Sequence, residues 1–121
     1  MFRLTFLVMV FLGLMCGGGV GVTDDAPNLG RELYVERCAL CHGTDGHGWD
    51  WSKKVAQPPM PIPNLSKTVR DLDDRYLKRI ILDGGEAVGR TRFMPAFRFG
   101  MKEKEAEALI RYLRSLSNSG S

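Results

Sequence analysis

The sequence has few cysteines and histidines and no strong excess of charge of either sign. Its 121 residues include three Cys and two His, and 17 Lys and Arg against 14 Asp and Glu give a net charge of +3. Three cysteines do not make a disulfide framework, and a nearly balanced charge is not typical of a nucleic-acid-binding protein. Low-complexity tracts and internal repeats are also lacking, and from the length of 121 residues we expect one domain at most.

Long hydrophobic runs are lacking too, except near the N-terminus. Arg3 precedes an uncharged, mainly apolar run from Leu4 to Met15, which small residues follow, and this pattern predicts a signal peptide over residues 1–21. Two alternatives stay open. The uncharged stretch is just long enough to remain as a membrane anchor, although its glycines do not favour this, and Cys16 is a candidate for lipidation. Each alternative places the domain outside the cytoplasm, in the periplasm or associated with the membrane.

The other two cysteines belong to the segment Cys38-Ala39-Leu40-Cys41-His42, which has the attachment pattern of a c-type haem. If the segment ends a helix, side chains three positions apart share one face, so both thiols can reach the vinyl groups along one porphyrin edge. His42 follows directly, and its imidazole can turn under the ring toward the iron. We therefore predict one haem c, covalently bound through Cys38 and Cys41, with His42 as an iron ligand.

A redox dithiol and a zinc site also use the Cys-x-x-Cys spacing. A thioredoxin-like dithiol is expected in a βαβ context, and no convincing strand lies nearby. Zinc usually takes four ligands, and the further candidates are His47 and Cys16, the latter within the predicted leader. The haem interpretation is favoured, and these two stay open beside it.

A haem iron bound by His42 needs a sixth ligand, and Met is a well-known partner. The methionines after the leader are Met60, Met94 and Met101. Met101 falls where the last helix is expected to begin, and Met60 lies in a Pro-rich segment that we assign to the His42 side. We therefore favour Met94, which Pro95 stiffens in a separate loop.

The Pro-rich segment, residues 57–65, holds four prolines and is predicted to be an extended wrap, since such a sequence forms neither a regular helix nor a central strand. A backbone carbonyl of this wrap would fix the tautomer and orientation of the His42 imidazole. Just before the wrap stand Trp49 and Trp51. Either they cover the small core or an indole N–H donates to a haem propionate.

Hydrophobic spacing predicts three main helices, at Leu29–Arg37, Asp71–Leu82 and Lys102–Ser117. Asn28 is a reasonable N-cap for the first helix and Asp71 or Asp73 for the second, which Gly84 or Gly85 should end. No strong capping residue precedes the third. The helices define a domain over residues 29–117, with a linker at 22–28 and a flexible tail at 118–121.

Together these motifs resemble those of the class I cytochromes c, over roughly residues 28–117. The haem-binding turn is similar at Cys38–Gly43 with Gly46 and Gly48, and the crossing of the first and last helices is similar at Gly30 and Tyr34 with Leu109 and Tyr112. Pro63-Asn64-Leu65 is similar to the family's Pro-Asn-Leu, and Gly84-Gly85 followed by Met94-Pro95-Ala96-Phe97 resembles its axial methionine loop. The Trp that binds a propionate in mitochondrial members has no clear counterpart here.

The resemblance implies an all-α cytochrome c fold, with three main helices plus loops wrapped around one haem. It implies that the Pro63 carbonyl accepts a hydrogen bond from His42, that Leu65 packs on the ring and that Met94 completes the coordination of the iron. The implied function is one-electron transfer between redox protein donors and acceptors, by a monomer and without enzyme activity. A subunit of a membrane oxidoreductase complex is the alternative, and a haem enzyme or sensor with a labile sixth ligand is less favoured.

The sequence also contains a set of basic residues that could steer acidic redox partners. The members are Arg90, Arg92, Arg98, Lys53 and Lys54. The competing interpretation is that these residues are scattered, solvated charges. We favour this second interpretation over a basic rim.

Overall fold

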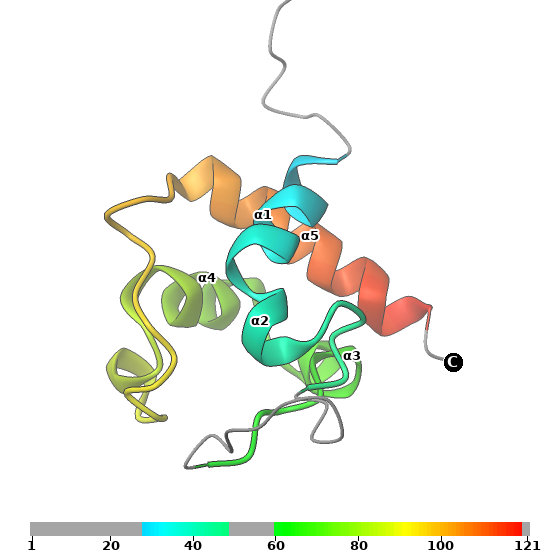
Figure 1. Ribbon diagram of the computed structural model, residues 1–121. Helices are drawn as coiled ribbons and strands as arrows, with labels where there is room; N and C mark the ends of the chain where they lie inside the picture. Colours follow the sequence, from blue (N-terminus) through cyan, green and yellow to red (C-terminus); the bar gives the residue numbers. More distant parts are fainter. Residues whose placement is uncertain (1–27, 49–59, 120–121) are drawn as a thin grey trace, which may run out of the picture.

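The structure, a computed structural model, describes residues 28–48 and 60–119. Within these ranges the chain is helical and has no strand, and its longer helices are α1 (Leu29–Arg37), α4 (Asp74–Asp83) and α5 (Glu103–Asn118). Two α-helices of four residues each, α2 (Ala39–His42) and α3 (Leu65–Thr68), and two 3₁₀ turns, η1 (Val69–Asp71) and η2 (Glu86–Val88), join them. Helix α5 runs diagonally behind α1 (Figure 1) and also contacts α3 and α4.

The crossing of α1 and α5 forms the centre of the core. A side chain at Gly30 would place its Cβ 2.1 Å from the Ala108 carbonyl oxygen, so only glycine allows the two backbones to approach this closely. The Tyr34 ring, which is fully buried, lies against the Tyr112 ring with 5.3 Å between centroids. The predicted crossing is therefore confirmed, and it accounts for a glycine inside a helix, where glycine otherwise costs about 1 kcal/mol relative to alanine.

The N-terminal boundary of α1 corrects one capping prediction, and that of α4 decides between two predicted caps. Helix α1 has the predicted bounds, but Asn28 already adopts helical dihedral angles and its side chain makes no capping bond in the described part of the chain. Helix α4 begins at Asp74 instead of Asp71, because Leu72 is extended, with φ −106° and ψ 136°. Asp73 is the true cap, and its carboxylate accepts the Tyr76 backbone N–H at 2.8 Å.

Helix α5 is one residue shorter at its start than predicted, and one residue longer at its end. Lys102 is extended, and its backbone N–H donates to the Glu105 carboxylate at 2.6 Å. This bond, from an acidic residue in the first turn, satisfies one of the groups that a helix start leaves unpaired. This start has no strong sequence signal, because the usual capping residues are Ser, Thr, Asp and Asn.

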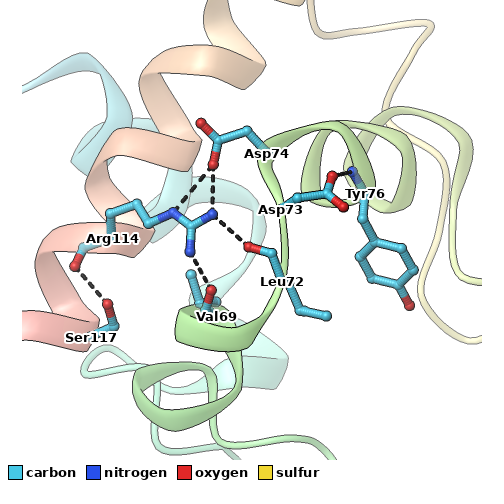
Figure 2. A network of polar contacts seen from close by, with 7 residues as sticks. All are labelled: Val69, Leu72, Asp73, Asp74, Tyr76, Arg114 and Ser117. Carbon is cyan, nitrogen blue, oxygen red and sulfur yellow. Dashed lines mark hydrogen bonds and ion pairs between the residues drawn. The ribbon is translucent and has the colours of Figure 1, made fainter.

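Arg114 fastens α5 to the segment that enters α4 (Figure 2). Its guanidinium donates to the Val69 carbonyl, to the Leu72 carbonyl at 2.6 Å and to the Asp74 carboxylate at 2.6 Å. A guanidinium has five N–H donors in a rigid fork, so one side chain satisfies two carbonyls freed by the end of η1. The contact fixes where α4 starts relative to the core, and so where its C-terminal end lies.

None of the helices in the described ranges is long and apolar enough to cross a membrane. Some predictions fall on residues that lie outside the described ranges. These are the leader with Cys16, most of the linker, and Trp49, Trp51, Lys53 and Lys54.

Candidate haem-binding site

The predicted attachment segment lies at a break between α1 and α2. Cys38 separates the two helices, and its carbonyl accepts the His42 backbone N–H at 2.9 Å. Helix α2 ends at His42, because Gly43 takes a φ of 78°, a conformation that glycine adopts readily. Cys41 and His42 therefore end a helix as expected, whereas Cys38 lies at the break before it, and all three come from one short turn.

The two thiols of this turn have different surroundings. Cys38 is partly buried against the hydrophobic core, whereas Cys41 is exposed, and in the described ranges both are free. Burial raises the pKa of the Cys38 thiol to about 11, although the nearby Arg37 opposes the shift. A group attached to both sulfurs would therefore lie with one edge at the boundary between core and solvent.

The His42 imidazole is held in its neutral form. Burial lowers its pKa, and the Pro63 backbone carbonyl, which lies close to the ring, partly opposes this effect. Its Nδ1 atom is buried, and no group in the described ranges meets it with hydrogen-bond geometry. A neutral imidazole is the form that binds a metal, and a buried, unpaired polar atom is rare in native proteins.

The turn after His42 brings the Pro63-Asn64-Leu65 segment to the site. Gly46 and Gly48 both have positive φ, and the Gly48 N–H donates to the His42 carbonyl at 2.8 Å. The Gly46 carbonyl then accepts the Leu65 N–H at 2.7 Å. Residues 61–64 lie outside any helix, as predicted, but Leu65 begins α3 instead of continuing the wrap. Residues 57–59 of the wrap lie outside the described ranges.

The loop that carries Met94, residues 89–100 and hereafter the methionine loop, folds back along the end of α4. The Met94 carbonyl accepts the Gly85 N–H at 2.9 Å, the Phe97 N–H donates to the Ile81 carbonyl at 3.1 Å and the Arg98 N–H to the Leu82 carbonyl at 3.0 Å. Gly84, with φ 84°, ends α4 as expected. Loop N–H groups thus satisfy the carbonyls of the last turn of α4, a non-local pairing that hydrophobic spacing does not reveal.

The three candidate methionines have different environments. Met101 is only 4% exposed and belongs to the hydrophobic core, whereas Met60 and Met94 are both partly exposed. A core position leaves Met101 with an ordinary packing role. The choice between Met94 and Met60 stays a prediction.

The arginines of the predicted basic set already have partners within the fold. Arg98 pairs with Asp83 at 2.6 Å, Arg90 donates to the Tyr76 hydroxyl at 3.2 Å, and the Arg92 guanidinium lies 5.9 Å from the Phe93 ring centroid. The ion pair offsets the charge of Arg98, whereas Arg90 and Arg92 keep their positive charge, and the role of the basic set in steering stays a prediction.

Residues 25–113 match the family model described as cytochrome C oxidase, cbb3-type, subunit III. The chain belongs to this family. The match includes every predicted site residue from Cys38 to Met94, and membership in a c-type cytochrome family confirms the all-α cytochrome c fold. No curated protein matches the chain.

The residues of this cytochrome c domain fit the covalent haem that its family implies. A neutral imidazole at His42 beside Pro63, a partly buried thiol at Cys38 and an exposed thiol at Cys41 lie within one turn. By contrast, the described ranges contain no group of three or more His, Cys, Asp or Glu side chains arranged to hold a metal ion.

Proposed function

We propose that the protein is a one-electron carrier that holds a single haem c between His42 and Met94. The observation that carries the proposal is the α2 turn, which presents two free thiols and a neutral imidazole beside the Pro63 carbonyl. When bound, the haem supplies the ferric–ferrous couple. The protein itself would tether the haem, supply the iron ligands and exclude water.

Each proposed site residue has a distinct task. Cys38 and Cys41 would form the thioether links to a haem, and the Pro63 carbonyl would accept the ring N–H of His42, which would keep the imidazole in the tautomer that binds iron. Leu65, placed by its bond to Gly46, would pack on the bound haem. Because Cys41 is exposed, it would hold its side of the haem near the surface that meets partners.

Met94 completes the iron coordination from the methionine loop. Ligation by the same two residues in both oxidation states leaves little to rearrange on electron transfer. Methionine ligation raises the reduction potential, which suits electron acceptance from quinol-linked or dehydrogenase donors outside the cytoplasm.

The family favours a second candidate function, as a subunit held within a membrane oxidase complex, since the matched family is named for a subunit of a cbb3-type oxidase. The haem chemistry is the same, and only the partners differ. Fractionation of native cells distinguishes the two: a separate carrier is recovered free of oxidase, whereas a subunit copurifies with it. Mass spectrometry of the same material reports leader cleavage, lipid at Cys16 and covalent haem together.

The ligand set is tested with Met94→Ala in the haem-loaded protein. The wild type is expected to be low-spin, with the weak red absorption band of methionine-to-iron ligation, and Met94→Ala is expected to lose this band. Met60→Ala is the matched control and should retain it. If the band survives in Met94→Ala and disappears in Met60→Ala, the assignment of the sixth ligand is wrong. A wild-type protein that is high-spin and binds carbon monoxide readily would instead favour a haem enzyme or sensor.

A further inference from the structure

Arg37 connects the haem-attachment segment to the methionine loop. It is the last residue of α1 and directly precedes Cys38, and its guanidinium donates to the Gly100 carbonyl at 2.7 Å. Gly100 is the last residue of the methionine loop, and the next residue, Met101, is buried in the core. The bond therefore spans 63 residues of sequence and joins the segments that supply the two proposed axial ligands.

Several other described contacts of the methionine loop attach it to α4 and to the turn that follows α4. They include the backbone bonds of Met94, Phe97 and Arg98, the ion pair between Arg98 and Asp83, and the Arg90 bonds to Tyr76 and Gly85. These polar contacts fix the loop along α4, and Phe97 packs against the shared core. Arg37 supplies a contact from the α1 side, next to the residue that begins the attachment segment.

Local geometry favours an arginine at position 37 and a small residue at position 100 for this contact. The Arg37 side chain is 27% exposed, so it is partly shielded from water, and a cationic donor makes a stronger hydrogen bond than a neutral one. A Cβ at position 100 would lie 3.1 Å from a guanidinium nitrogen of Arg37, closer than an ordinary contact. Lysine keeps the charge but not the planar fork.

From this geometry we infer that Arg37 is a positioning residue that holds the methionine loop where Met94 can bind the iron. The inference rests on the proposed His42 and Met94 ligation. Arg37 itself touches neither ligand atom. It acts through Gly100, by limiting how far the loop can move away from the attachment segment and expose the sixth coordination position.

The test is the affinity of the ferric, haem-loaded protein for added imidazole, followed by absorption spectroscopy. Imidazole binds only when Met94 leaves, so Arg37→Gln is expected to raise the affinity roughly fivefold to tenfold, the value of one hydrogen bond. Arg31→Gln is the matched control, because it removes the same charge from an exposed position of the same helix. Arg37→Lys should give an intermediate affinity.

Three outcomes would overturn the inference: an Arg37→Gln affinity within twofold of the wild type, an equal rise in Arg31→Gln, or a rise matched by an equal loss of global stability in urea. Gly100→Ala disturbs the same contact from the loop side and should raise the affinity even if Arg37→Gln folds poorly. Failure of the proposed function is seen separately, because a wild type without the methionine band fails before any variant is made.

Discussion

The α1–α5 crossing and the methionine loop each make a close approach to a glycine, Gly30 in α1 and Gly85 just after α4, yet different contacts surround the two glycines. A Cβ at Gly30 would lie 2.1 Å from the Ala108 carbonyl oxygen, and one at Gly85 would lie 2.2 Å from the Thr91 carbonyl oxygen. The crossing is lined with buried side chains such as Tyr34 and Leu109, whereas the methionine loop exposes the whole Phe99 side chain. The crossing is therefore held by apolar burial, and the loop by hydrogen bonds and an ion pair near solvent.

This difference predicts that the two regions fail in different ways. Loss of apolar contacts in the crossing lowers the free energy of unfolding of the whole domain, because α1, α4 and α5 share one core. Loss of contacts at the loop opens a local segment, since few buried contacts hold it. Stability and iron ligation should therefore respond separately to substitutions.

The largest effect is expected from Gly30→Ala. The added methyl group would overlap the Ala108 backbone, so the helices must separate, and overpacking of this kind costs about 3 kcal/mol of the free energy of unfolding. Urea denaturation followed by far-UV circular dichroism measures the loss. Arg31→Ala, at an exposed position next to it in α1, should change stability by less than about 0.5 kcal/mol. A Gly30→Ala protein as stable as the wild type would show that the crossing is looser than described.

A smaller global effect and a larger local one are expected from Gly85→Ala. The backbone at Gly85 has an ordinary φ of −65°, so the conflict arises only from contact of the new methyl group with Thr91 and with the Met94 Cβ, 3.1 Å away. The loop should shift, and the methionine-to-iron band should weaken, at a cost of about 1–2 kcal/mol in unfolding free energy. The unfolding free energy and the methionine-to-iron band are measured on one sample. A full band together with a loss of stability as large as that of Gly30→Ala would contradict the division into two regions.

Elements with a local signal could be predicted from the sequence. Apolar spacing located α1 and α5 within one residue at either end, and Cys38, Cys41 and His42 indicated the attachment turn, because their chemistry depends on spacing along one short segment. The start of α4 was placed too early, because Asp71 and Asp73 are both acceptable caps and only the extended Leu72 decides between them.

Contacts between distant segments left no such signal. A basic residue such as Arg114 suits the C-terminal part of a helix wherever its side chain points, yet here it binds carbonyls more than 40 residues away. Arg37 had no predicted partner at all, although it reaches Gly100. A long basic side chain is compatible with solvent and with many carbonyls, so its partner is fixed only by the fold. For the same reason the pairing of His42 with Met94 stays a prediction, since ligation depends on two loops meeting across a cofactor.

The smallest effect is expected from Tyr34→Phe, which tests whether the crossing and the site are coupled. The buried Tyr34 hydroxyl donates to the Gly43 carbonyl at 2.6 Å, just after His42. Burial raises the pKa of this phenol well above its usual range, so the hydroxyl stays protonated and remains a donor. Phenylalanine keeps the ring against Tyr112 and removes only the donor, which leaves the Gly43 carbonyl with the longer bond from the Gly46 N–H, at 3.3 Å.

The expected loss in Tyr34→Phe is about 1 kcal/mol of unfolding free energy, the net value of one hydrogen bond. Hydrogen exchange should become faster at the Gly48 and Leu65 amides, whose bonds depend on the Gly43 turn, and the methionine-to-iron band should persist. Tyr112→Phe removes a hydroxyl from the same aromatic pair without touching Gly43, so its exchange rates at these amides should match the wild type. If both variants speed exchange equally, the aromatic packing alone supports the turn, and the Tyr34 hydroxyl does not carry the coupling between the crossing and the haem-attachment segment.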